Sequence, residues 1–95
     1  MAAYIIFEVD VKNPEGYAKN RDLIQPTLDP FGGRFLVRGG NVECLEGTWK
    51  PLRLVVVEFP SVEKAKEWWS SEEYRPAKRL RHETCDTEMI LVDGV

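Results

Sequence analysis

The order of apolar and polar residues predicts four strands. In Tyr4–Val11, apolar side chains occupy the odd-numbered positions, while Glu8 and Asp10 occupy even-numbered ones. This alternation is the pattern of a half-buried strand. The segments Arg34–Arg38, Arg53–Phe59 and Asp86–Asp93 are also rich in β-branched or long apolar residues and are predicted as strands. A short hairpin arm over 42–45 is expected to return after a glycine-rich turn.

The first helical segment begins at Asn13, whose side chain can accept a hydrogen bond from a free backbone N–H, with Pro14 in the first turn. Pro26 is expected to kink or break this helix, and Gly32-Gly33 to end it. The helical period places four residues on the face expected to look at the sheet: Tyr17, Arg21, Ile24 and Leu28.

A second helical segment follows Pro60, with Ser61 as its cap. Its apolar face consists of Val62, Ala65, Trp68 and Trp69. A further helical piece starts near Ser71 or Glu72 and is predicted to place Tyr74, Ala77, Leu80 and Arg81 on one face.

The order strand, helix, strand, strand, helix, strand predicts one α+β domain over residues 1–95, a ferredoxin-like βαββαβ sandwich. In that fold a four-stranded antiparallel sheet carries two helices on one face and leaves the other bare. The strand cores 4–7, 54–57 and 89–92 are apolar on both parities, which is typical of strands covered on both faces. We therefore expect a homodimer in which a second copy covers the bare face.

The composition limits the partners. The formal net charge is −3 over 95 residues, which disfavours general binding to nucleic acid or anionic lipid. The basic run from Arg75 to His82 is the local exception, but an RNA-recognition module would need stacking aromatics on its third strand, and Leu54–Glu58 has none. The apolar start is interrupted by Glu8, so no membrane span is expected and a cytoplasmic location is the default.

The two cysteines, Cys44 and Cys85, have no CxxC spacing, and the chain contains a single histidine. We expect free thiols, no metal site and no cofactor.

Five segments together resemble one family of small bacterial proteins: GGRFLVRGG (32–40), LEGTWKP (45–51), RLVVVEFPS (53–61), SSEEYRPAKRLR (70–81) and ILVDGV (90–95). By them the chain is similar to the family called domain of unknown function 1330. The resemblance implies a dimeric α/β barrel of the ferredoxin-like type and assigns no biochemical role.

The resemblance has one departure. Relatives often read Tyr-x-x-Tyr-Arg in the first helix, whereas this chain has Tyr17 followed by Asn20-Arg21. If the second ring belongs to a pocket, that pocket is altered here. The wider fold resembles cofactor-free monooxygenases, muconolactone-type isomerases, haem-dependent chlorite-degrading enzymes and ligand-sensing domains, so the fold indicates little about function.

Glu8 and Glu58 are the first candidates for chemistry, because the strands that carry them are expected to be parallel central neighbours. Two carboxylates held close at one rim would suit general acid or base work. The alternative is that each pairs with an arginine at the end of the sheet: Arg34, Arg38 or Arg53.

Those same arginines could instead bind a carboxylate or phosphate through their forked donors. Arg21 shares a helix face with Tyr17, and an arginine under a sheet needs a carboxylate partner. That partner could be Glu8, Glu58 or a ligand.

Aromatic residues and the single histidine are the remaining candidates. Trp68, Trp69 and Tyr74 could line an apolar pocket, although rings at helical spacing are usually core. His82 is the only side chain whose ordinary pKa lies near neutrality, and its place near a helix end is also explained by the helix dipole.

The resulting hypothesis is a homodimer that binds a small molecule between helices and sheet. The candidate ligand-binding residues are Tyr17, Arg21, Arg38, Glu58, Trp68, Tyr74 and His82. No catalytic residue is assigned, and whether the protein is a cofactor-independent enzyme stays open. The alternative is a structural or partner-binding dimer whose charges satisfy one another.

Overall fold

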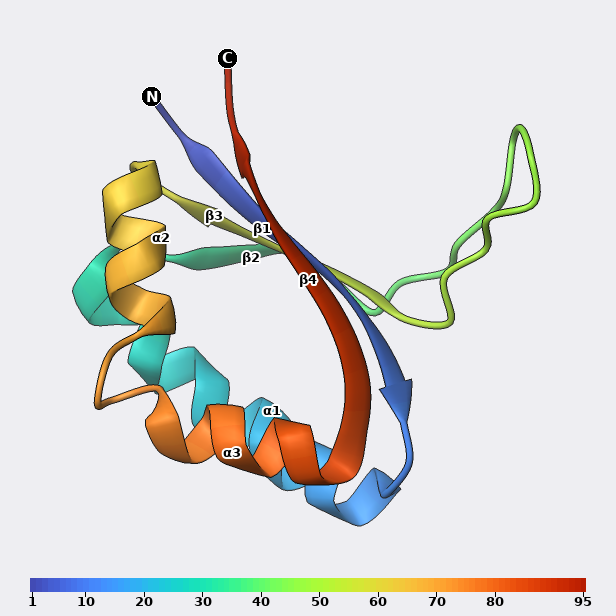
Figure 1. Ribbon diagram of the computed structural model, residues 1–95, viewed down its shortest axis with the longest axis horizontal. Helices are drawn as coiled ribbons and strands as arrows, with labels where there is room; N and C mark the ends of the chain where they lie inside the picture. Colours follow the sequence, from blue (N-terminus) through green and yellow to red (C-terminus); the bar gives the residue numbers. More distant parts are fainter.

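The computed structural model describes residues 1–95 and has the predicted order of elements (Figure 1). The two helical pieces predicted after Pro60 are separate helices, so the fold has three α-helices, and the last of them begins at Arg75 and not near Ser71 or Glu72. The elements are β1 (Ala3–Val11), α1 (Pro14–Leu28), the 3-10 turn η1 (Asp29–Phe31), β2 (Arg34–Arg38), β3 (Leu54–Phe59), α2 (Val62–Trp69), α3 (Arg75–Thr84) and β4 (Cys85–Asp93).

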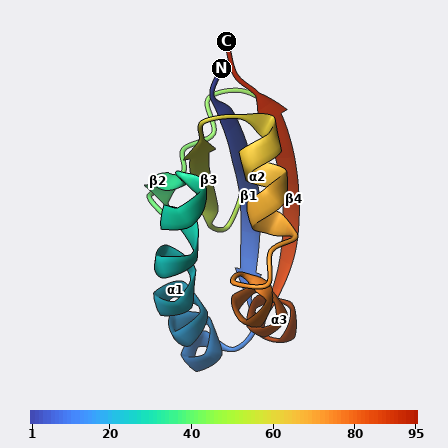
Figure 2. The ribbon, with the colours of Figure 1, turned by 90° about the vertical axis from the view of Figure 1, so that its left-hand side faces the viewer.

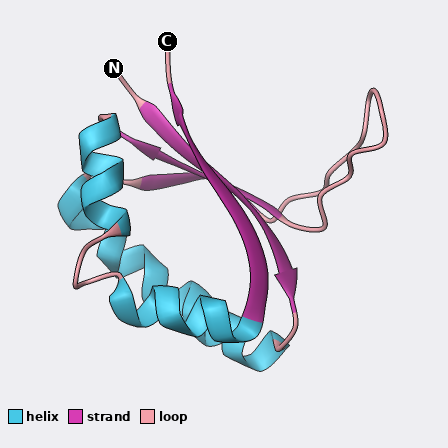
Figure 3. Ribbon diagram, in the orientation of Figure 1, coloured by secondary structure: helices cyan, strands magenta, loops and turns pink.

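The four strands form one sheet in the order β2-β3-β1-β4, and every neighbouring pair is antiparallel. Figure 3 shows all the helices on the same side of this sheet. The ferredoxin-like α+β fold is therefore confirmed. Antiparallel pairing sets β1 against the reversed β3, so that Ile5 pairs with Val57 and Glu8 pairs with Leu54.

Both predicted helix caps are present. The Asn13 side chain accepts a hydrogen bond from the Gly16 N–H at 3.1 Å, and the Ser61 hydroxyl accepts one from the Lys64 N–H at 3.1 Å. Each cap satisfies a backbone donor that has no partner within the first turn of its helix.

The expected break at Pro26 is wrong, because α1 continues through it to Leu28. Ile24 and Leu28 on either side of the proline are buried in the core, and their packing holds the last turn in place. The chain then turns through η1 to Gly32, whose φ of 72° lies in the left-handed region that glycine adopts without strain.

The expected hairpin arm over 42–45 is also wrong. Residues 39–53 form a long loop, called here the 39–53 arm, that projects away from the helices (Figure 1). The strand that returns beside β2 is β3, so residues 42–45 remain in the connection between the two strands.

The core lies between the sheet and the helices, which Figure 2 shows from the helix side. The strand residues that point to the helices, among them Ile5, Phe7 and Val9, are almost completely buried. Trp68 stacks on Tyr74 with ring centroids 3.9 Å apart, and its indole N–H donates to the Thr27 hydroxyl at 3.0 Å. This pair fixes α2 and α3 against α1.

The opposite side of the sheet, called here the open face, carries no helix. The register aligns one apolar residue from each strand in a row across it: Val37, Val56, Ile6 and Ile90. Ile90 is 58% exposed, so the row faces solvent in a single chain. A β-bulge at Leu36 interrupts the pairing of β2 with β3.

Candidate functional site

An apolar groove of about 460 Å³ lies between α2 and the strands β1 and β4, at the β4 edge of the sheet, and is called here the α2–β4 groove. Its volume is within the range of small-molecule sites, about 300 to 1,000 Å³. Residues of α2 form one wall, and the helix-facing Ile5, Met89 and Leu91 form most of the other, joined by Ile90 at the sheet edge. The lining residues are Ile5, Ala65, Lys66, Trp69, Ser70, Met89, Ile90 and Leu91.

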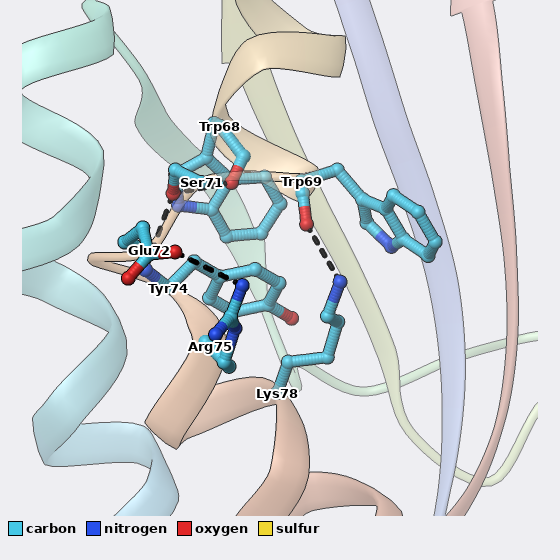
Figure 4. Close-up of polar contacts among 7 residues, drawn as sticks. All are labelled: Trp68, Trp69, Ser71, Glu72, Tyr74, Arg75 and Lys78. Atoms are coloured by element: carbon cyan, nitrogen blue, oxygen red, sulfur yellow. Dashed lines mark hydrogen bonds and ion pairs between the residues drawn. The ribbon is translucent and has the colours of Figure 1, made fainter.

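A lysine of α3 reaches the Trp69 wall of the groove. The Lys78 ammonium donates to the Trp69 carbonyl at 2.8 Å and lies 3.8 Å from the centroid of the indole ring (Figure 4). Burial lowers the pKa of Lys78, and the positive charges of Arg81 and Arg75 lower it further. No carboxylate pairs with Lys78.

Arg81 lies one turn further along α3 and is only 2% exposed. Its Nε–H donates to the Tyr74 hydroxyl at 3.3 Å, and its guanidinium carbon lies 5.9 Å from the Phe7 ring centroid. Burial raises the pKa of Tyr74, although the Arg81 charge opposes that shift. The phenol therefore stays protonated at neutral pH.

A second, smaller cavity of about 10 Å³, room for about one water molecule, lies between α1 and the sheet. Three predicted site residues meet there, namely Tyr17, Arg21 and Arg38. The Arg38 guanidinium donates to the Arg21 carbonyl at 2.8 Å and lies 4.2 Å from the Phe35 ring centroid. As it stands, this cavity is too small to hold a metabolite.

Asn20 also lines the small cavity and is fully buried. Its Nδ2 donates to the Ala77 carbonyl of α3, but its Oδ1 has no partner. Sequence reasoning did not select Asn20 as a site residue, yet it is the position at which the resemblance departs from Tyr-x-x-Tyr-Arg. The departure from that pattern at position 20 was the sequence signal that pointed to Asn20.

The expected ion pair of Arg21 is wrong, because Arg21 is exposed and its side chain has no carboxylate partner. The helix presents Asn20, Ile24 and Leu28 to the core instead. The buried arginine of this fold is Arg81.

The expected carboxylate pair is also wrong. Because β1 and β3 are antiparallel, Glu58 pairs in register with Tyr4, four residues from Glu8 along β1. Glu58 accepts from Arg34 at 2.7 Å, and Glu8 accepts from the Trp49 indole at 3.3 Å. Glu58 therefore pairs with an arginine, which was the alternative interpretation. Its side chain lies on the open face, away from the α2–β4 groove.

The remaining predicted residues divide between core and surface. Trp68 and Tyr74 are almost fully buried, and the Tyr74 hydroxyl accepts from Arg81. His82 lines a polar cavity of about 470 Å³ at the far end of the sheet. Burial lowers the pKa of His82, and the charges of Arg81 and Lys78 lower it further.

Cys44 is exposed, Cys85 is buried, and both thiols are free. No group of three or more His, Cys, Asp and Glu side chains is arranged to hold a metal ion. None of the helices has the length and apolar composition needed to cross a membrane.

Proteins of low sequence identity share this fold. A protein of unknown function from Rhodopseudomonas palustris has a TM-score of 0.78 at 20% identity, over 99% of this chain and 82% of that one. A dimeric ferredoxin-like protein of unknown function from Jannaschia sp. CCS1 has a TM-score of 0.67 at 8% identity, over 99% and 100%. A Caulobacter crescentus CB15 protein provisionally named an antibiotic biosynthesis monooxygenase has a TM-score of 0.62 at 14% identity, over 99% and 90%.

A family model described as Domain of unknown function (DUF1330) matches residues 2–95. The match spans every strand and helix, which confirms the resemblance inferred from the sequence. Comparison with curated proteins finds no match.

Proposed function

The chain belongs to the family described as Domain of unknown function (DUF1330), and from this premise we propose that it is a homodimer that binds a small molecule between its helices and its sheet. One observation carries the ligand part of the proposal: an apolar groove of ligand size lies between α2 and the sheet. The support for the dimer comes from the other side of the sheet.

The open face has the composition of a protein interface. Its central row is apolar on all four strands, and Ile90 and Val92 of β4 extend the exposed apolar surface. A contiguous exposed apolar face is rare on a monomer and is typical of an interaction surface. A second copy of the same sheet offers a matching apolar face, so face-to-face association would cover the exposed apolar surface of both chains.

The 39–53 arm supports the same partner. It carries three largely exposed apolar side chains, Leu45, Trp49 and Leu52, and projects on the side away from the helices (Figure 1). Trp49 is tied by its indole to Glu8, whose parity places it on the open face. An arm in this position would pack on a subunit docked there. The dimeric state given for the Jannaschia protein agrees with this arrangement.

Unpaired polar atoms support a ligand beneath the helices. Buried polar groups in proteins nearly always have a hydrogen-bond partner, so each exception needs an explanation. Here Asn20 Oδ1 and Thr87 Oγ1 are both buried without partners. Asn20 lines the small cavity between α1 and the sheet, and Thr87 lines the polar cavity that also contains His82. A polar ligand atom that reached either cavity would satisfy the atom there.

The experiment is a pair of measurements on the purified chain. Size-exclusion chromatography with light scattering should give the mass of two chains at micromolar concentration. A thermal-shift screen of small metabolites should find compounds that raise the melting temperature, and Trp69→Ala should remove the shift while leaving the dimer intact. A monomer mass would overturn the dimer, and a screen without a single hit would overturn the ligand site.

Catalysis is a further step of the same proposal. The provisional monooxygenase name of the Caulobacter protein motivates a search for cofactor-independent oxygenation or isomerisation of any compound that the screen identifies. No residue of this chain is assigned to a chemical step. If compounds bind and none is converted, the protein is a binding protein.

The competing function is a structural or partner-binding dimer. It would leave the α2–β4 groove empty under all conditions. A crystal structure at high resolution with only ordered water in the groove, after soaking with the screened compounds, would favour it.

A further inference from the structure

Two cations of α3 have no anion to neutralise them. Arg81 is almost fully buried and Lys78 is half-buried, and neither takes part in an ion pair. A buried charge without a partner is costly, and proteins normally pair it or bind it to a ligand. The Arg81 guanidinium, which has no anionic partner, is therefore a candidate contact for a ligand.

Positive side chains gather at the groove. Besides Arg81 and Lys78, Lys66 lines the α2–β4 groove, and no Asp or Glu side chain lines it. The positive charge of Arg81 lowers the pKa of both Lys78 and His82, with burial as the larger cause in each case. An anion bound here would face several positive groups.

Hydrogen-bond donors converge with this charge. The Nε–H of Arg81 donates to Tyr74, while its two terminal nitrogens have no protein partner and are not fully buried, so solvent or a ligand can reach them. The Tyr74 hydroxyl accepts that bond and has no acceptor for its own proton. Lys78 runs beside the Tyr74 ring, with its ammonium 5.9 Å from the ring centroid (Figure 4). Donors without acceptors are what an oxyanion binds.

The cationic residues adjoin the apolar groove. Lys78 covers the indole of Trp69, which lines the groove. Arg81 lies over Phe7, and Phe7 pairs in register with Met89, another lining residue. Neither Lys78 nor Arg81 lines the groove itself, so their positive charge borders its apolar walls at Trp69 and at the Phe7–Met89 pair.

We propose that the ligand of the α2–β4 groove is a small organic acid, with its apolar body along Ile5, Met89 and Trp69 and its carboxylate held by Lys78 and Arg81. The inference rests on the proposed small-molecule site and names the chemical class that the site takes. An inorganic anion lacks the apolar body, and a neutral apolar compound leaves both cations unpaired. Arginine forms two parallel hydrogen bonds with a carboxylate, which fixes the orientation of the acid.

The test compares acids with their neutral counterparts. A series of straight-chain and aromatic monocarboxylates of two to ten carbons is titrated by calorimetry into the full-length chain, alongside the corresponding primary amides. Acids with an apolar body should bind about tenfold or more tightly than their amides, and acetate and inorganic phosphate should bind weakly. Equal affinity of acids and amides, or an absence of binding by every acid, would overturn the inference.

Variants then locate the charge. Arg81→Met and Lys78→Met should each weaken the best acid about tenfold without changing the affinity of its amide. Arg79→Met removes an exposed cation of the same helix and should leave both affinities unchanged. If Arg81→Met does not fold, Lys78→Met carries the same comparison, because its side chain is partly exposed. Unchanged acid affinity in Lys78→Met and in a folded Arg81 variant contradicts the assignment.

The outcomes separate this inference from the function on which it rests. If neutral compounds bind in the groove, detected as chemical-shift changes at Met89 and Trp69, and acids show no preference, the ligand site stands and the acid class fails. If no compound of either kind binds, both fail.

Discussion

Ile6 and Val56 face each other across β1 and β3 on the side of the sheet that no helix covers. Their row is the centre of the proposed dimer interface. Ile6→Glu should convert the dimer to a monomer, because docking would bury an unpaired carboxylate. Light scattering at micromolar concentration measures the mass.

The matched control for this substitution is Leu23→Glu, which places the same charge on an exposed apolar position of α1. Leu23→Glu should remain dimeric. A dimer that persists in Ile6→Glu would place the interface elsewhere.

Trp49 tests the role of the 39–53 arm. Trp49→Ala should weaken the dimer about tenfold, since aromatic side chains dominate interface energetics. The monomer should lose little stability, because the hydrogen bond to Glu8 is exposed and such bonds contribute about 1 kcal/mol. Analytical ultracentrifugation over a dilution series gives the dissociation constant.

Trp49→Phe separates the two contributions of the indole. It keeps an apolar ring and removes the N–H donor, so it should dissociate much less readily than Trp49→Ala. Equal weakening by both variants would assign the effect to the Glu8 hydrogen bond and not to packing on the partner.

Trp68 is the predicted anchor of stability. It is almost fully buried, stacks on Tyr74 and donates to Thr27. Trp68→Ala should lower the free energy of unfolding by about 3 to 5 kcal/mol. Thr27→Val removes only the acceptor of the indole and should cost about 1 to 3 kcal/mol. Urea denaturation at one fixed protein concentration measures both, and a loss below 1 kcal/mol in Trp68→Ala would contradict the assignment.

Replacing Arg81 with methionine should not lower stability, in contrast to replacing Trp68. In the absence of ligand, Arg81→Met should leave the melting temperature unchanged or raise it, because a buried charge without a partner is replaced by an apolar side chain of similar length. Arg81→Glu should be strongly destabilising in comparison. A large loss of stability in Arg81→Met would mean that the guanidinium has a structural role that outweighs its burial.

His82 predicts a pH effect. Its pKa in the folded chain lies below the ordinary value of 6.5, so the unfolded chain takes up the proton first as the pH falls. Stability is therefore lost as the pH falls from above 6.5 towards the folded pKa, and becomes level below it. His82→Gln should lose less stability than the wild type between pH 7.5 and pH 5. An NMR titration of the imidazole should give a pKa below 6.5, and a value above 6.5 would reverse the sign.

Local signals were sufficient for much of the fold. Asn13 and Ser61 cap the helices as predicted, because a cap depends on residues three positions apart in the sequence. The parity of β1 was equally readable, since alternate residues of a strand point to opposite faces. These are properties of a few neighbouring residues, which the sequence displays directly.

The buried face of α1 was less readable. Ile24 and Leu28 belong both to the predicted face with Tyr17 and Arg21 and to the observed face with Asn20, so the apolar positions do not decide between them. The carbonyl of Ala77 decides, because it accepts from Asn20, and its position depends on how α3 packs. A contact between segments 57 residues apart has no local signature.

The Glu8 and Glu58 hypothesis failed for a related reason. Each position was correctly placed near a strand end, but the distance between the carboxylates depends on whether the strands run in the same direction. The hairpin between β2 and β3 reverses β3 relative to β1, and this separates the two carboxylates along the sheet.

The bulge at Leu36 has a consequence for where further chains can associate. It breaks the hydrogen-bonding pattern of β2, an edge strand only five residues long with an arginine at each end. A short, irregular and charged margin is a poor template for further strand addition. Strand addition is therefore disfavoured at β2, whereas the opposite edge is the regular, nine-residue β4, so any further chain that pairs edge to edge should add there.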